Sequence, residues 1–129
     1  MTRPFQKHPD LLPAIISWFE TNLPSWYIAE DLTGWTYPEK WITIQPTGGS
    51  ISRIRSGSPR FDVNVYGETK QEAMDGALDA VRCLMLMLNN THGNAVITNV
   101  VCEYPADISD PISERPRFVF DVTLTYRTN

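Results

Sequence analysis

The sequence predicts an α+β domain: one mainly antiparallel sheet of four to five strands, with two helices packed on one of its faces. A strand pattern at Arg60–Gly67 runs directly into a long helix with an apolar face at Thr69–Thr91, two more strand patterns follow that helix, and a shorter helix lies near the start of the chain. The expected order is therefore α-β-β-β-α-β-β. With 129 residues the chain has the length of a single domain, 1–129.

The composition is that of an ordinary globular domain, since hydrophobic residues make up 42% and charged residues 20%. The formal net charge of −4 argues against a domain that binds nucleic acid tightly, because such domains usually carry a basic face. No apolar run approaches the roughly 20 residues that span a bilayer, and the first residues lack the apolar centre of a secretory signal. We therefore expect a soluble, non-exported protein with no membrane partner.

The first third of the chain should hold one helix and two short strands. Apolar residues recur at helical spacing from about His8 to Asn22, and Pro24 stops the helix. Aromatic and β-branched residues then predict strands at Trp26–Ala29 and Trp41–Gln45.

The segment Pro46–Pro59 is rich in glycine and serine and has no hydrophobic period, so it predicts a long flexible loop between two strands. Structureless loops longer than about 12–15 residues are uncommon in compact domains and tend to be functional or disordered. We expect an arm that becomes ordered against a partner. The candidate contact residues in this arm are Gly48, Gly49, Ile51, Arg53, Ile54 and Arg55.

The second half of the chain gives the clearest periodic signals. The strand at Arg60–Gly67 alternates apolar and polar residues, so one face should be buried and the other wetter. The helix at Thr69–Thr91 opens with a capping box between Thr69 and Glu72, and Gly93 should end it in a left-handed conformation. The stripe expected to face inward consists of Ala73, Ala77, Ala80, Val81, Leu84 and Leu88.

Two closing strands are expected at Ala95–Tyr104 and Arg117–Thr128, the second with strict alternation of apolar and polar residues. The segment between them is acidic and rich in proline, so it should be a solvated loop. It supplies a second set of candidate contact residues, on the face or rim opposite the arm: Asp107, Asp110 and Glu114.

The sequence shows no pattern that predicts catalysis, a cofactor or a metal. His8 and His92 lie at predicted helix ends without a positioned partner. The "TGGS" at Thr47–Ser50 lacks the Lys-Ser/Thr pair of a phosphate-binding loop. Cys83 and Cys102 have no partner at metal-ligand spacing, and we expect two buried free thiols. We therefore expect a protein that is not an enzyme.

The order of the segments resembles that of the tail terminator (tail completion) proteins of bacteriophages with long, non-contractile tails, the siphophages. The likeness covers nearly the whole chain and rests on strand and helix patterns. The segments that carry it are an N-terminal helix "PDLLPAIISWF", an extended "WITIQPTGG", the strand "PRFDVNVYG", the helix "TKQEAMDGALDAVRCLMLML" and the closing "DP…RPRFVFDVTLTYR".

This resemblance implies a structural virion protein that forms a homohexameric ring on the head-proximal end of the tail tube. Such rings stop polymerisation of the major tail (tube) protein, join the tail to the head-tail connector or stopper protein, and let DNA pass through the lumen without specific binding. The protein would reside in the host cytoplasm during assembly and in the virion tail afterwards. An acidic subunit suits such a lumen because it repels phosphate.

Two other functions stay open. One is another neck or head-completion protein of the virion, with a similar size and build. The other belongs to a different class: a small-ligand-binding α+β domain, which would need a pocket where Trp26, Trp35, Tyr37 and Trp41 converge with an aspartate or histidine. An enclosed, partly polar pocket within one subunit would favour this last function.

Overall fold

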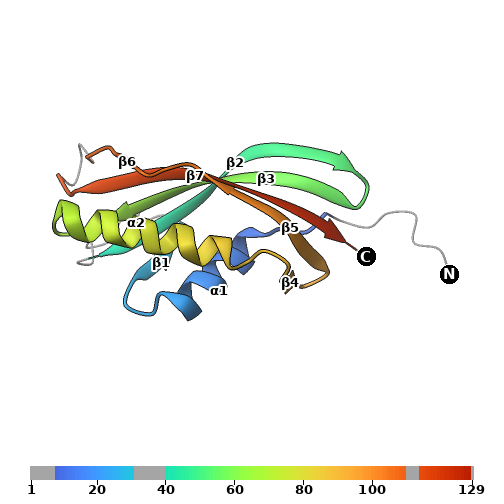
Figure 1. Ribbon diagram of the computed structural model, residues 1–129, viewed down its shortest axis with the longest axis horizontal. Helices are drawn as coiled ribbons and strands as arrows, with labels where there is room; N and C mark the ends of the chain where they lie inside the picture. The colour runs from blue at the N-terminus through green and yellow to red at the C-terminus, as the bar shows by residue number, and fades with distance from the viewer. Residues whose placement is uncertain (1–7, 31–39, 110–113, 129) are drawn as a thin grey trace.

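The computed structural model describes residues 8–30, 40–109 and 114–128. It has the α+β class that the sequence predicts, with two helices and a mixed, curled sheet (Figure 1). Within the described residues, neither helix has the length and apolar character needed to cross a membrane. The elements in chain order are α1 (Leu12–Asn22), β1 (Tyr27–Ala29), β2 (Trp41–Arg53), β3 (Ser56–Tyr66), α2 (Lys70–Met85), β4 (Thr91–His92), β5 (Ala95–Cys102), β6 (Ala106–Asp107) and β7 (Arg117–Thr128).

The sheet has seven strands in the described part of the chain, more than the four to five expected. Its spatial order is β1-β2-β3-β7-β5-β4, and β6 pairs with β7 beside that path. The pairing of β1 with β2 is parallel and the other pairings are antiparallel. The predicted order of elements holds for the longer strands and helices. It misses β4 and β6, because two-residue strands have no periodicity to detect.

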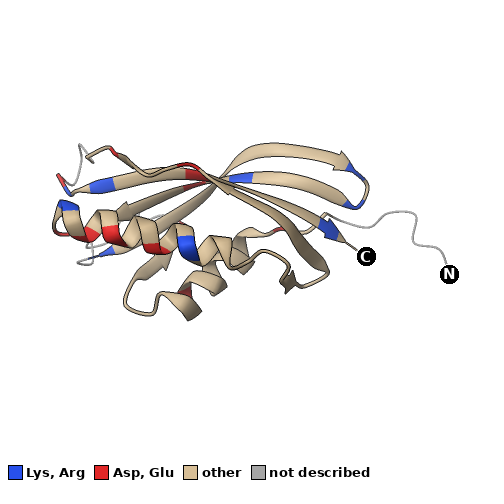
Figure 2. Cartoon of the chain, in the orientation of Figure 1, with Lys and Arg blue, Asp and Glu red and all other residues tan. Residues whose placement is uncertain are grey.

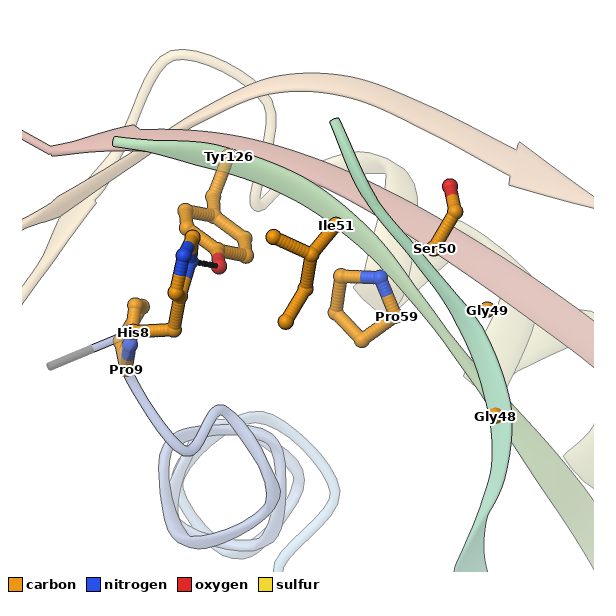
Figure 3. A pocket seen from close by; sticks show the side chains of 8 residues that line it. All are labelled: His8, Pro9, Gly48, Gly49, Ser50, Ile51, Pro59 and Tyr126. Carbon is orange, nitrogen blue, oxygen red and sulfur yellow. Dashed lines mark hydrogen bonds between the residues drawn. The ribbon is translucent and has the colours of Figure 1, made fainter. Parts of the chain in front are cut away.

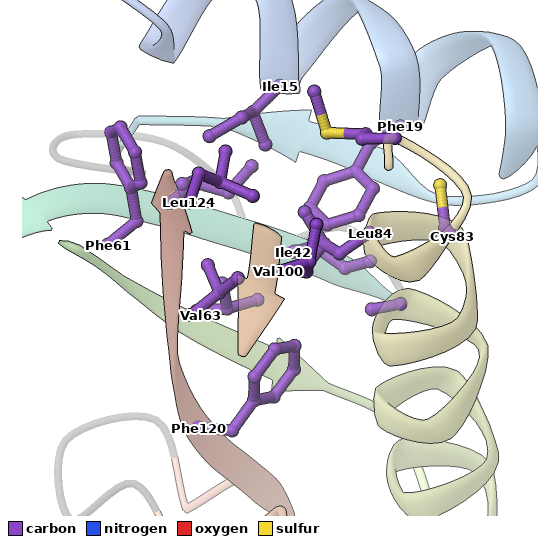
Figure 4. Packing of buried hydrophobic residues seen from close by; sticks show 14 of the residues in the cluster. Ile15, Phe19, Ile42, Phe61, Val63, Cys83, Leu84, Val100, Phe120 and Leu124 are labelled. Atoms are coloured by element: carbon purple, nitrogen blue, oxygen red, sulfur yellow. The ribbon is translucent and has the colours of Figure 1, made fainter. Parts of the chain in front are cut away.

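One hydrophobic core lies between the helices and the curled sheet, whose long strands β2, β3 and β7 lie above the helices in Figure 1. Alternation along β3 buries Phe61, Val63 and Val65, as the sequence predicts. The same alternation buries every second residue of β7, from Phe118 to Tyr126. Ile15 and Phe19 of α1 complete the core from the other side (Figure 4). Full burial of one such side chain stabilises the fold by about 1.5–3 kcal/mol.

The start of α2 confirms the predicted cap. The Thr69 hydroxyl accepts a hydrogen bond from the Glu72 amide at 3.1 Å, and the Glu72 carboxylate accepts one from the Glu68 amide at 2.9 Å. The Thr69 hydroxyl thus satisfies an amide that the first turn of the helix leaves without a partner, and the Glu72 carboxylate reaches back to the residue before the cap.

The end of α2 differs from the prediction. The helix stops at Met85, and the following turns bury Met87 and leave Leu88 exposed, whereas Leu88 was expected in the buried stripe. Asn89 takes the positive φ of 67° that diverts the chain. Gly93 also has a positive φ of 63°, but it lies in the two-residue turn between β4 and β5 and does not cap the helix.

Two tryptophans hold α1 and β1 against α2. The Trp18 indole donates a hydrogen bond to the Cys83 carbonyl at 2.7 Å. The Trp26 ring packs so close to Gly76 that a Cβ added there would lie 2.3 Å from a ring carbon. Glycine in a helix is unfavourable in itself, so its presence at this position is explained by the close approach of the indole.

We predict that Gly76→Ala lowers the free energy of unfolding by about 1–3 kcal/mol, the usual cost of overpacking. In a protein that lacks the Trp26 indole, Gly76→Ala should instead raise the free energy of unfolding by about 1 kcal/mol, because alanine favours the helix more than glycine does. Denaturant titration of Gly76→Ala, alone and combined with Trp26→Ala, measures both effects. A Gly76→Ala variant that is more stable than the parent would contradict the packing described here.

His92 is placed so that its protonation should destabilise the fold. Its ring meets Trp18 edge to face, with centroids 5.4 Å apart. Its Nε2 is buried and has no hydrogen-bond partner among the described residues. Burial lowers the pKa of His92, because the charged imidazolium loses hydration there. The unfolded chain therefore binds this proton more readily than the folded chain.

The stability contributed by neutral His92 should be fully present above the ordinary histidine pKa of about 6.5 and should be lost as the pH falls below it. We predict that the melting temperature drops between about pH 7.5 and about pH 5.5. The drop should be smaller in His92→Phe, which keeps an aromatic ring against Trp18 but cannot take up a proton. Equal drops in the two proteins would show that His92 is not responsible.

Candidate interaction surface

The segment expected to be a flexible loop is instead a long β-hairpin, so this part of the fold prediction is wrong. β2 continues to Arg53, only Ile54 and Arg55 form the turn, and β3 begins at Ser56. The prediction failed because it relied on a hydrophobic period. Backbone pairing holds these residues in place. Residues 46–55 are exposed, and residues 56–59 are small or half-buried, so the segment carries no hydrophobic period to detect.

The hairpin is firmly joined to the rest of the sheet. Its turn is tied to the end of β7 by a hydrogen bond from the Thr128 amide to the Arg55 carbonyl, at 2.7 Å. β2 bulges between Pro46 and Gly48, and the Arg60 guanidinium donates to the Thr47 carbonyl within this bulge at 3.3 Å. The candidate arm is therefore a preformed element, one that need not become ordered on contact with a partner.

The outer half of β2 is exposed on both faces. Residues 41–44 are buried, whereas every residue from 45 to 53 is exposed. Among the described residues, β1 pairs with β2 only at Trp41, Ile42 and Thr43, so the edge beyond Thr43 is open. Edges of this kind invite pairing with another chain, and Pro46 and the bulges are devices that limit it. This outer half, residues 45–53, is the candidate interaction surface.

Gly48 and Gly49 shape the bulge, and they do so for different reasons. Both have a φ of +107°, which side-chain-bearing residues rarely adopt. A Cβ on Gly49 would lie 2.2 Å from the Ser58 carbonyl oxygen, whereas a Cβ on Gly48 would meet nothing within 4 Å. Gly49 is therefore required by both conformation and space, and Gly48 by conformation alone.

A hollow of about 400 Å³ lies beneath the hairpin, beside the start of α1 (Figure 3). Tyr126 forms its floor: the hydroxyl is hydrogen-bonded to His8 Nδ1, and burial raises the pKa of Tyr126. Ile51 is 67% exposed above it. The residues that line the hollow are His8, Pro9, Gly48, Gly49, Ser50, Ile51, Pro59 and Tyr126.

A second open hollow, of about 640 Å³, lies at the tip of the hairpin and is basic. Three arginines line it, Arg53 and Arg55 from the hairpin and Arg127 from β7. No described carboxylate lies within salt-bridge distance of these guanidinium groups. Hydroxyl side chains complete the lining: Ser52, Ser56, Thr98, Thr125, Tyr126 and Thr128.

The acidic candidates lie at the other end of the long axis of the molecule. Asp107, in β6, forms a salt bridge of 2.9 Å with Lys70 at the start of α2. Glu114 precedes β7, is exposed and has a positive φ of 58°. Asp110 lies outside the described residues. Figure 2 shows acidic residues along α2 at one end of the molecule and basic residues at the hairpin turn at the other. The two predicted sets of contact residues are thus separated.

Sequence reasoning missed an exposed apolar surface on the second half of α2 and in the turns that follow it. Leu78, Met85, Leu86 and Leu88 are all more than a third exposed. In the sequence the apolar residues at positions 74, 78, 81, 85 and 88 form a second stripe at helical spacing beside the one that faces the sheet. In the structure Met74 and Val81 pack partly against the core, and Leu88 lies beyond the end of α2. The sequence shows that stripe, but hydropathy alone cannot tell which of two adjacent apolar stripes is buried.

The described residues hold no cluster of three or more His, Cys, Asp or Glu side chains that could bind a metal ion. Both cysteines are free, Cys83 buried and Cys102 half-buried. Burial raises the pKa of each thiol to about 11, so both are protonated and weakly nucleophilic near neutral pH.

We predict that Gly49→Ala disrupts the hairpin more than Gly48→Ala. Gly48→Ala carries only backbone strain, of order 1–3 kcal/mol, whereas Gly49→Ala adds a collision with the backbone of β3. Amide hydrogen exchange across residues 45–60 should show a larger loss of protection in Gly49→Ala. Equal protection in the two variants would contradict the geometry of the bulge.

Comparison of the chain with protein-family models finds no match, and comparison with curated proteins finds none either.

Proposed function

We propose that this chain is a tail terminator subunit of a siphophage. Six copies form a ring that caps the head-proximal end of the tail tube, stops its polymerisation and joins the tail to the head connector. The observation that carries the proposal is the outer half of β2: nine consecutive residues, ordered as a strand yet exposed on both faces. In a monomer such an exposed strand edge is open to unwanted pairing, whereas in an assembly a neighbouring subunit can cover it.

The preformed hairpin supports a structural role. An arm that is already ordered avoids much of the entropy cost that a flexible loop would incur on binding. Its bulge is held by Arg60, and its turn is held by β7. The resemblance implies two partners, the tube protein and the connector, and this hairpin is the element that we assign to such contacts.

The charge supports passage of DNA through the ring. Each subunit carries a formal charge of −4. A ring of acidic subunits repels the phosphate backbone, so a moving duplex does not adhere to the lumen. This accounts for a lumen that DNA crosses without specific binding, in a virion component that assembles in the host cytoplasm.

The small-ligand alternative has weaker support. Trp41 is buried and stacks on Tyr66, with ring centroids 4.4 Å apart. Trp26 packs against Gly76. Both indoles therefore fill space within the fold, and Trp35 and Tyr37 lie outside the described residues. The alternative of a neck or head-completion protein differs from the proposal in its partner, so it is tested through partners.

The oligomeric mass tests the proposal. Native mass spectrometry across a concentration series, with and without isolated tail tubes, should show either a hexamer in free solution or a monomer that converts to six copies on tubes. A hexamer near six times 14.7 kDa is the expected species. Binding to heads or connectors but never to tubes would favour the neck protein. A stable monomer or dimer that ignores both would contradict a virion role.

A further inference from the structure

Two stretches of opposite net charge lie at opposite ends of the long axis of this acidic chain (Figure 2), although the acidic end also holds cationic side chains such as Lys70. Residues 45–60 of the hairpin contain Arg53, Arg55 and Arg60 and no carboxylate. Residues 68–79 at the start of α2 contain one cationic side chain, Lys70, and four carboxylates: Glu68, Glu72, Asp75 and Asp79. Figures 1 and 2 show the hairpin turn and the start of α2 at opposite ends of the molecule. The two charged regions therefore cannot neutralise each other within one subunit.

Exposed apolar residues accompany both regions. Near the tip of the hairpin, Ile51 in β2 is 67% exposed and Ile54 in the turn is 74% exposed. The acidic half of α2 continues into the exposed apolar surface formed by Leu78, Met85, Leu86 and Leu88. Each region thus combines large apolar side chains with a net charge. The net charge is positive at the hairpin and negative along α2, where Lys70 and Arg82 offset part of the acidic charge. Such pairs of surfaces are complementary in both hydrophobic contact and potential.

We propose that the hairpin of one copy docks on the outer face of α2 of the next copy. Arg53 and Arg55 then face Asp75 and Asp79. The exposed isoleucines of the hairpin cover the exposed leucines and methionine on α2 and in the turns after it. The donor and acceptor surfaces are different, so the contact is heterologous and repeats head to tail, which generates a ring where the rotation closes. This inference rests on the proposed ring and names the surfaces that build it.

The acceptor groups are free to exchange their present contacts. Asp79 lies 3.6 Å from Arg82, and both side chains are largely solvated. The Asp75 carboxylate accepts a hydrogen bond from the side-chain amide of Gln71 at 2.8 Å, on the exposed face of the helix. Solvated ion pairs of this kind contribute little to stability, so replacing them with contacts to a neighbour has a small cost.

A second copy fits the hairpin better than DNA does. A phosphate-binding tip would need its arginines but not two exposed isoleucines beside them. A copy of the same chain supplies both the carboxylates and the apolar surface. DNA binding by the same arginines is therefore an outcome that the experiment must separate.

The test uses two charge-reversed full-length variants, Arg53→Glu with Arg55→Glu and Asp75→Arg with Asp79→Arg. Each variant alone places like charges across the contact, so self-association should weaken at least ~100-fold in sedimentation velocity. Mixed in equal amounts, the two variants should assemble again, because each hairpin then finds an α2 of opposite charge. The control, Arg53→Lys with Arg55→Lys, keeps the charge and should assemble like the parent.

All substituted side chains are at least partly exposed, so melting temperatures near the parent value should confirm that each variant folds. Assembly of either reversed variant alone at the parent's affinity would overturn the inference, as would a mixture that stays unassembled. Loss of binding to a labelled DNA duplex in Arg53→Glu with Arg55→Glu, with rings intact, would assign the arginines to DNA and also overturn it.

The same variants separate this inference from the proposed function. If the reversed variants still cap tail tubes, the ring stands and the docking of hairpin on helix is wrong. If mixing restores oligomers that never bind tubes, the contact between copies stands and the tail terminator function is wrong.

Discussion

The antiparallel pairing of β3 with β7 is the interaction on which the rest of the structure depends. On its other side β3 pairs with β2, and β7 pairs with β5, so the remaining strands of the sheet extend from this central pair toward both edges. Its inner face supplies Val63 and Leu124 to the core that the helices cover. Its outer end pairs Gly57 with Tyr126 and supports the uncovered half of β2. Without that support the hairpin would be an isolated two-stranded ribbon, which is marginally stable in water.

The parts of the fold that could be predicted are those in which one face of a helix or strand is buried, because apolar residues then recur in the sequence at regular spacing. β7 occupies Arg117–Thr128, the residues its alternation indicates, and Thr69 caps α2 as the capping box indicates. The parts that could not be predicted have no such period. β4 and β6 are two residues long, and the parallel pairing of β1 depends on where the chain meets β2, which local sequence does not encode.

The candidate site illustrates the same limit. Gly48, Gly49, Arg53 and Arg55 were identified by composition, and they do lie on an exposed, projecting element. Their conformation was mistaken, because glycine and serine suggested flexibility where the backbone pairs with β3. The apolar outer stripe of α2 was visible in the sequence, but only the position of α1 and the sheet shows that Leu78 and Met85 face solvent. Preformed donor and acceptor surfaces of this kind suit a subunit that assembles without refolding.

The central claim, that this chain terminates a tail tube, is tested most directly by tube elongation. Purified tube protein would be allowed to polymerise with increasing amounts of this protein, and tube lengths would be measured by electron microscopy. We predict that elongation stops once six copies are present for each growing end, with extra density at one end of each tube. Unchanged tube lengths, or inhibition only when this protein matches the tube protein in amount, would contradict it.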